Sequence, residues 1–322
     1  MADLAGLPST RQLSTRLLSK GVAVLDGAMA TQLEARGVDT TSVLWSAVAL
    51  EDNLDAIRAV HESYFAAGAQ VATTNSYQAT VPGFVAAGLT EDQARWAITR
   101  SATLARQARA DWMLTHPGSD LLVAGSIGPY GAYLADGSEY RGDYTLSREH
   151  YADFHRPRLQ ALAEGGVDLF AVETQPKLDE ARAVIDLVTA EFPGTPAWVS
   201  FQLRDACTLA DGTPLAEAAK WADDQSTVVA VGINCVPPQM VEDALGVLAA
   251  HTRSPLLCYP NSGDVHDPAT GTWRPPAEPE PIADHVSRWI AAGAQLIGGC
   301  CRTSPHDIAE IARQVRLRES PR

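Results

Sequence analysis

The sequence contains no run of about 18 or more consecutive apolar residues, the length that a helix needs to cross a bilayer. A membrane-spanning protein is therefore not expected. The first 20 residues carry scattered Arg and Lys and have no continuous apolar core, which argues against a secretory signal peptide. These features predict a cytoplasmic protein.

Basic residues are also scarce. Lys and Arg total 25 against 39 Asp and Glu, so the formal net charge is −14. Proteins that bind nucleic acid or an anionic membrane surface need a basic patch. The charge balance therefore argues against nucleic acid and membrane as partners and favours small molecules as ligands. It does not predict an oligomeric state.

Cysteine is sparse and odd in number, with Cys207, Cys235, Cys258, Cys300 and Cys301 as the whole set. Five cysteines in a chain of this length do not resemble a disulfide framework. In a reducing compartment they are either buried thiols or thiolate ligands of a metal. The chain also lacks a His-x-x-x-His pair, which makes a zinc hydrolase a weak hypothesis.

Eight short apolar runs alternate with helix-length segments. The runs are β-branched and continuously apolar, as is typical of strands buried on both faces. They cover residues 22–26, 70–75, 121–126, 167–173, 197–203, 228–234, 256–260 and 295–300. Glycines precede several of them, at 66–70, 163–168 and 291–295, and suit left-handed caps that end the preceding helices.

This eightfold strand–helix repeat, without a Pro-rich linker, predicts an α/β fold: one (β/α)8 TIM barrel domain over residues 1–322. A doubly wound open sheet is the alternative, and the regular spacing disfavours it. Two long connections, at 127–147 and 261–281, follow the third and seventh strands. Both would lie at the C-terminal face of the strands, where barrel enzymes have their active sites.

Polar or sulfur-containing side chains occur at the same end of nearly every predicted strand. These strand ends include Asp26, Thr74, Ser126, Glu173, Asn234 with Cys235, Tyr259, and Cys300 with Cys301. Because the ends of barrel strands surround one opening, we expect these side chains to share a cavity.

Three of the cysteines, Cys235, Cys300 and Cys301, would then meet. Alternation along an ideal strand would turn Cys300 and Cys301 to opposite faces, but Gly298 and Gly299 before them permit a distortion that turns both sulfurs inward. Thr303 or Ser304 would cap the helix that follows, with Pro305 at its first position. The alternatives are buried thiols or a disulfide between Cys300 and Cys301.

Three thiolates are a soft ligand set that suits Zn²⁺ and leaves one coordination position open. A substrate thiol that binds there would lose its proton and become a nucleophile for a soft carbon, such as the methyl group of a sulfonium. We expect the three cysteines to act catalytically through this metal. The sequence does not exclude Cys207 or Cys258 as a further ligand.

The remaining strand-end residues are candidates for substrate binding. Asp26 and Glu173 would bind the ammonium of an amino-acid thiol, although Asp26 could instead cap a helix and Glu173 could pair with a buried Arg. Trp45, Tyr77, Tyr130 and Tyr133 would face a sulfonium by cation–π attraction, or simply pack. Thr74, Ser126 and Asn234 complete the predicted substrate site.

The sequence resembles the zinc-dependent homocysteine S-methyltransferases over nearly its whole length. The resemblance is carried by "DGAMAT", "LWSA", "SYQAT", "VAGSIGPYGAYLADGSEYRGDY", "FHRPR", "ADGTPL", "GINC", "YPNSG" and "LIGGCCRT". It implies a (β/α)8 barrel, zinc ligands at Cys235, Cys300 and Cys301, and amino-acid anchors at Asp26 and Glu173.

The resemblance also implies transfer of a methyl group from S-methylmethionine, or less efficiently S-adenosylmethionine, to L-homocysteine, which forms methionine. Val172 and Asn75 depart from the family pattern, so the preferred methyl donor is not predicted, and a selenium-containing acceptor is also open. A barrel that only binds thiols, without turnover, is the competing hypothesis from another class.

Overall fold

The structure is a computed structural model that describes residues 21–42, 44–267, 272–274 and 280–319. The N-terminal residues 1–20, on which the signal-peptide argument depends, lie outside the described residues, as do 268–271 and 275–279 of the second long connection. Within the described ranges, no helix has the length and apolar character that a bilayer crossing requires.

Eight parallel strands form the centre of the molecule, and each lies within or overlaps one of the predicted apolar runs. They are β1 (Ala23–Val24), β2 (Val71–Thr73), β3 (Leu122–Ile127), β4 (Leu169–Gln175), β5 (Ala197–Phe201), β8 (Val228–Asn234), β9 (Leu256–Tyr259) and β12 (Ala294–Ile297). The strands neighbour one another in the order β1-β12-β9-β8-β5-β4-β3-β2. A parallel bridge between Leu25 and Val71 joins β1 to β2, so the sheet closes and the predicted TIM barrel is confirmed.

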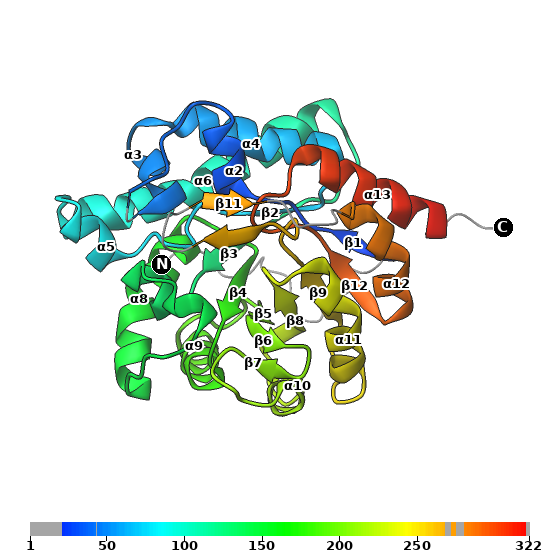
Figure 1. Cartoon of the computed structure of the whole chain (residues 1–322). Coiled ribbons are helices and arrows are strands. Elements are labelled where there is room, and N and C mark those ends of the chain that lie inside the picture. Colours follow the sequence, from blue (N-terminus) through cyan, green and yellow to red (C-terminus); the bar gives the residue numbers. More distant parts are fainter. Residues whose placement is uncertain (1–20, 43, 268–271, 275–279, 320–322) are drawn as a thin grey trace.

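Helices surround this barrel on its outside (Figure 1). The longer ones are α4 (Leu54–Ala67), α6 (Glu91–Thr115), α8 (Arg148–Glu164), α9 (Leu178–Glu191), α10 (Leu215–Asp223), α11 (Pro238–Ala249) and α13 (Pro305–Glu319). Shorter helices are α2 (Met29–Glu34), α3 (Ala49–Asp52), α5 (Val81–Ala86), α7 (Tyr130–Leu134) and α12 (Val286–Ala291). Three 3₁₀ turns cover Trp45–Val48 (η1), Ser138–Tyr140 (η2) and Ile282–His285 (η3).

Two small antiparallel hairpins lie outside the barrel sheet. One pairs β6 (Leu203–Asp205) with β7 (Thr208–Leu209), and the other pairs β10 (Val265–Asp267) with β11 (Thr272–Arg274). The glycine signals predicted between helix and strand are also present. Gly68 caps α4 with a φ of +104°, a conformation that only glycine adopts without strain.

The core has two apolar layers because side chains alternate along each strand. In β4, Leu169 and Ala171 point into the barrel, whereas Phe170 and Val172 pack against the surrounding helices. All four side chains are buried. This alternation explains the continuously apolar strands and determines which residues face the opening at the C-terminal end of the barrel.

Candidate active site

The candidate site lies where the inward-facing positions of the strands change from apolar to polar. Glu173 is the next inward position after Leu169 and Ala171, and Ser126 is the next after Leu122 and Ala124. The same alternation leads to Asn234 in β8, Tyr259 in β9 and, beyond the end of β12, Cys300. The predicted convergence of strand ends therefore follows from the period-2 pattern of a closed barrel.

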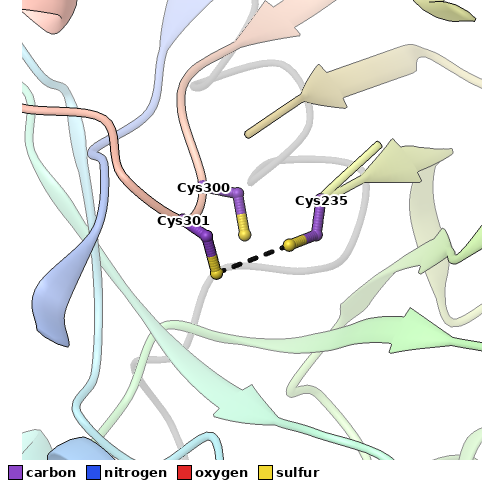
Figure 2. Close-up of side chains that lie close together, drawn as sticks. All are labelled: Cys235, Cys300 and Cys301. Atoms are coloured by element: carbon purple, nitrogen blue, oxygen red, sulfur yellow. Dashed lines mark hydrogen bonds between the residues drawn. The ribbon is translucent and has the colours of Figure 1, made fainter. Parts of the chain in front are cut away.

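The three cysteines of this layer form a cluster. The sulfur atoms of Cys235, Cys300 and Cys301 all lie within 4.8 Å of one another, and those of Cys235 and Cys301 are 3.5 Å apart. Figure 2 shows the three side chains converging from β8 on one side and from the segment after β12 on the other. Hydrogen bonding by the thiols of Cys300 and Cys301 lowers the pKa of Cys235 well below its ordinary value.

An unusual backbone conformation presents Cys235 to the cluster. Its φ is +54°, in the left-handed region that a residue with a Cβ rarely adopts, and its N–H donates to Tyr259 O at 3.0 Å. Thr174, at the end of β4, is left-handed as well, with a φ of +57°. Non-glycine residues in this region are concentrated at functional sites because the surrounding structure must hold them there.

Cys300 and Cys301 lie beyond the end of β12. The structure therefore gives a different explanation for the two glycines that precede them. The structure ends β12 at Ile297, so Cys301 need not continue the strand alternation and turn to the face opposite Cys300. Neither Gly298 nor Gly299 has a positive φ, and the expectation of a glycine-specific distortion is therefore wrong. Space is the actual reason: a Cβ at Gly298 would lie 2.6 Å from that of Leu25, and one at Gly299 would lie 2.3 Å from Thr303 Oγ1.

The side chain of Asn234 makes hydrogen bonds that hold it next to the cysteine cluster. Its Oδ1 accepts from Thr174 N–H and Ser200 Oγ, both at 2.8 Å, while its Nδ2 donates to Thr174 Oγ1 at 2.7 Å. The same Nδ2 lies 3.9 Å from the sulfur of Cys300. Asn234 thereby connects the strained end of β4 to the cysteines.

The other two cysteines do not belong to the cluster. Cys258 packs in the apolar layer outside the barrel strands, and Cys207 is exposed between β6 and β7. All five cysteines lie within the described residues and all are free thiols, so no disulfide joins Cys300 to Cys301. The cluster of three is a set of ligands able to hold a metal.

Asp26 lies at the end of β1 and connects it to β2. Its carboxylate accepts from the N–H of Thr73 at 2.7 Å and from Thr73 Oγ1 at 2.9 Å, and it does not cap α2. Burial raises the pKa of Asp26 to about 7, against the lowering effect of the Thr73 hydrogen bonds. The negative charge of Glu173 raises it further, so the two carboxylates lie within electrostatic range of each other.

Glu173 is buried at the opposite side of the same opening. The Ser126 hydroxyl donates to its Oε1, and Tyr259 also lies within hydrogen-bonding range of its side chain. Burial raises the pKa of Glu173 to about 7. Within the described ranges, no arginine forms a salt bridge with Glu173, although the charge of buried Arg158 is near enough to lower its pKa. Thr74 supports this side of the site, since its Oγ1 accepts from the Ser126 N–H at 3.0 Å.

The aromatic candidates separate into two groups. Trp45 and Tyr77 pack edge to face with ring centroids 6.1 Å apart, and Tyr77 is close enough to Cys235 and Glu173 for their charges to raise its pKa. Asn75 holds the Trp45 segment by donating to Ser46 O at 2.8 Å.

Tyr130 and Tyr133 instead pack with Phe154, at centroid distances of 4.9 Å and 5.4 Å respectively. Tyr130 also lies 5.7 Å from the ring of Tyr144. These contacts place both tyrosines in an aromatic cluster at the base of the connection between β3 and α8.

Sequence reasoning missed two residues of this same connection. The hydroxyl of Tyr140 lies 4.0 Å from the sulfur of Cys235. The neighbouring Glu139 has a buried Oε2 without a hydrogen-bond partner in the part of the chain that the structure describes. The sequence does place an acidic and an aromatic residue next to each other in a long connection at the C-terminal face. The spacing of residues along the chain could not show which side chains of that connection point into the site.

Comparison with known proteins agrees with this geometry. The family model for homocysteine S-methyltransferase matches residues 23–315. The chain belongs to the homocysteine S-methyltransferase family. The *E. coli* member is 50% identical over 301 residues, which cover 93% of this chain and 97% of that protein. *Bacillus subtilis* YbgG, another member, is 48% identical over 297 residues, covering 91% and 94%.

A solved structure of the same family has a closely similar fold. The metallated form of the *E. coli* homocysteine methyltransferase MmuM aligns with a TM-score of 0.84 at 48% identity, over 91% of this chain and 96% of that one. Its oxidised form aligns with a TM-score of 0.85. A metal is therefore found in a relative of the same fold, and the present chain has a three-cysteine cluster able to hold one.

Proposed function

We propose that this protein is a zinc-dependent homocysteine S-methyltransferase, which transfers a methyl group from a sulfonium donor to L-homocysteine and forms L-methionine. The observation that carries the proposal is the cluster of Cys235, Cys300 and Cys301 in the same opening as the buried carboxylates of Asp26 and Glu173. Family membership supports the same reaction.

The cysteine cluster fits a zinc ion. Tetrahedral zinc with Zn–S bonds of about 2.3 Å requires sulfur atoms roughly 3.8 Å apart, and the three sulfurs here lie within 4.8 Å of one another. No His or carboxylate joins them as a fourth ligand among the described residues, which leaves room for a substrate thiol. When bound, zinc would ionise that thiol near neutral pH and favour its use as a nucleophile.

Asp26 and Glu173 would hold the ammonium group of homocysteine. Both carboxylates are buried in the opening beside the cysteines, and a buried charge is stabilised by an opposite charge. Binding of the ammonium would favour the ionised form of both groups, whose pKa burial raises to about 7. Thr73 and Ser126 keep the two carboxylates in place through their hydrogen bonds.

The reaction is a substitution at the methyl carbon. The sulfur of ionised homocysteine forms a new bond to this carbon, the bond from carbon to the donor sulfur breaks, and its electron pair stays on the donor sulfur. A positive sulfonium thereby becomes a neutral thioether, and the thiol proton is released to solvent. With S-methylmethionine as donor, both products are methionine; with S-adenosylmethionine, the second product is S-adenosylhomocysteine. We propose S-methylmethionine as the preferred donor.

A donor panel tests this function. Zinc-loaded protein under reducing conditions is incubated with homocysteine and S-methylmethionine, S-adenosylmethionine or betaine, and methionine is quantified. We expect rapid methionine formation with S-methylmethionine, a slower rate with S-adenosylmethionine, and loss of activity after removal of the metal by a chelator. Binding of homocysteine without methionine formation from any donor would identify a thiol-binding protein instead.

A further inference from the structure

The connection between β3 and α8 carries a carboxylate that the homocysteine site does not use. Glu139 lies in η2, and its Oε2 is buried without a hydrogen-bond partner within the described ranges. The adjacent Arg141 lowers the pKa of Glu139 by its charge, but its ion pairs are with Asp143 at 2.8 Å and Asp136 at 3.8 Å. A carboxylate whose buried oxygen has no partner is stabilised when a cation binds beside it.

Glu139 immediately precedes a residue that contacts the cysteine cluster. The next residue, Tyr140, has its hydroxyl 4.0 Å from Cys235 Sγ. The charges of Glu139 and Cys235 are close enough to interact, since a negative charge on Cys235 raises the pKa of Glu139. Glu139 likewise raises the pKa of Tyr77, which packs against Gly128 of the same connection. The carboxylate is therefore part of the same opening as the reacting centre.

The segment around Glu139 is held rigidly by contacts at its base. A Cβ on Gly131 would lie 2.6 Å from the Glu139 nitrogen, so η2 packs directly onto α7. Buried Glu180 of α9 binds both ends of the connection: its carboxylate accepts from the N–H of Tyr130 at 2.6 Å and from the hydroxyl of Tyr144 at 2.5 Å. His155 of α8 contacts the same carboxylate at 2.8 Å.

We propose that Glu139 binds the positive charge of the methyl donor and thereby selects cationic sulfonium donors over neutral thioethers. This inference rests on the proposed function. The acceptor brings one ammonium, for which Asp26 and Glu173 are available, whereas S-methylmethionine brings both a sulfonium and an ammonium. Glu139 is a separate, half-buried carboxylate with one buried, unpartnered oxygen, next in sequence to the tyrosine that contacts Cys235, and it supplies the matching charge. After transfer, the donor sulfur is neutral and this attraction weakens, which favours product release.

The test compares Glu139→Gln with the wild type and with Glu149→Gln, an exposed glutamate of α8 outside the site. Because a charge-assisted contact is lost, we expect the KM for S-methylmethionine to rise by about 10- to 100-fold in Glu139→Gln. The KM for homocysteine, the zinc content and the melting temperature should be unchanged. Titration calorimetry with S-methylmethionine should show the same loss of affinity without turnover, and Glu149→Gln should behave as the wild type.

The outcomes separate the two proposals. An active Glu139→Gln variant with an unchanged donor KM and affinity would overturn the role of Glu139 and leave the methyltransferase function standing. Failure of the wild type with every sulfonium donor would overturn the function itself. If Glu139→Gln does not fold, Glu139→Asp replaces it in the test. This variant keeps the charge but shortens the side chain by one methylene, and an unchanged donor KM in it would overturn the inference.

Discussion

The cysteine cluster and the Glu139 segment lie at the same opening but are positioned by different means. The cysteines adjoin strand ends, and backbone bonds from neighbouring strands hold them: Cys235 N–H donates to Tyr259 O, and Cys300 N–H donates to Pro260 O at 2.8 Å. Glu139 lies in a connection whose two ends depend on the side chain of Glu180. The proposed acceptor half of the site thus depends on the barrel, whereas the proposed donor half depends on a few buried polar contacts.

This difference predicts that the two halves can be impaired separately. The largest effect should come from the cysteine cluster. Cys301→Ala should lower methionine formation by more than about 100-fold, because loss of a ligand exceeds the 10- to 100-fold effect usual for residues that only support one. Zinc measured by atomic emission should fall well below one ion per chain.

Cys207→Ser is the matched control, because Cys207 is exposed and lies outside the cluster. It should retain both zinc and activity. Full metal content together with full activity in Cys301→Ala would remove the basis for a shared metal site.

The next effect concerns pH. Norleucine has the ammonium and carboxylate of homocysteine but no thiol, so its binding reports on Asp26 and Glu173 without ionisation of a ligand thiol. Burial raises the pKa of each carboxylate to about 7, so both become protonated, and lose their attraction for the ammonium, as the pH falls below 7. Affinity measured by calorimetry should then weaken by about tenfold per pH unit for each carboxylate that must ionise.

Asp26→Asn should make this pH dependence shallower, because one titrating carboxylate is gone. Norleucine affinity that is constant from pH 5.5 to pH 8, values chosen to bracket the pKa of about 7, would argue against an ammonium site at these residues.

A smaller effect is expected from changing Glu180, whose hydrogen bonds hold the two ends of the connection that carries Glu139. Glu180→Gln replaces one acceptor oxygen by an N–H donor that faces Tyr130 N–H or the Tyr144 hydroxyl. We expect a loss of about 1–3 kcal/mol in unfolding free energy and a raised KM for S-methylmethionine, with the homocysteine KM and the zinc content near wild type. Equal changes in both KM values would show that the halves are not independent.

The smallest effect should come from the cap of α13, close to the cysteines in sequence. Ser304 Oγ accepts from Asp307 N–H at 3.4 Å, and the Asp307 carboxylate accepts in return from Ser304 N–H at 2.8 Å. Ser304→Ala should cost about 1 kcal/mol, which corresponds to a melting temperature lower by about 2 °C. Zinc content should not change, and a loss of metal would show that the cap contributes to the cluster.

Local patterns predicted the strands and the cysteine cluster well, for an identifiable reason. Strands buried on both faces are continuously apolar, and a residue at a strand end takes its direction from the alternation before it, as Glu173 does after Leu169 and Ala171. The cap by Ser304 was likewise predictable from its neighbours. The role predicted for the glycines before Cys300 was wrong. They leave space for Leu25 and Thr303, and these contacts come from other parts of the chain that a local pattern does not include.

The sequence alone determined the barrel, the cysteine cluster and the carboxylates at the strand ends, since each depends on short-range periodicity and on the symmetry of a closed sheet. Only the tertiary structure decided that Cys235 and Thr174 adopt left-handed conformations, that Tyr140 reaches Cys235 and that one oxygen of Glu139 is buried. Those features depend on contacts between residues far apart in the chain, such as Glu180 with Tyr130, and no local pattern encodes them.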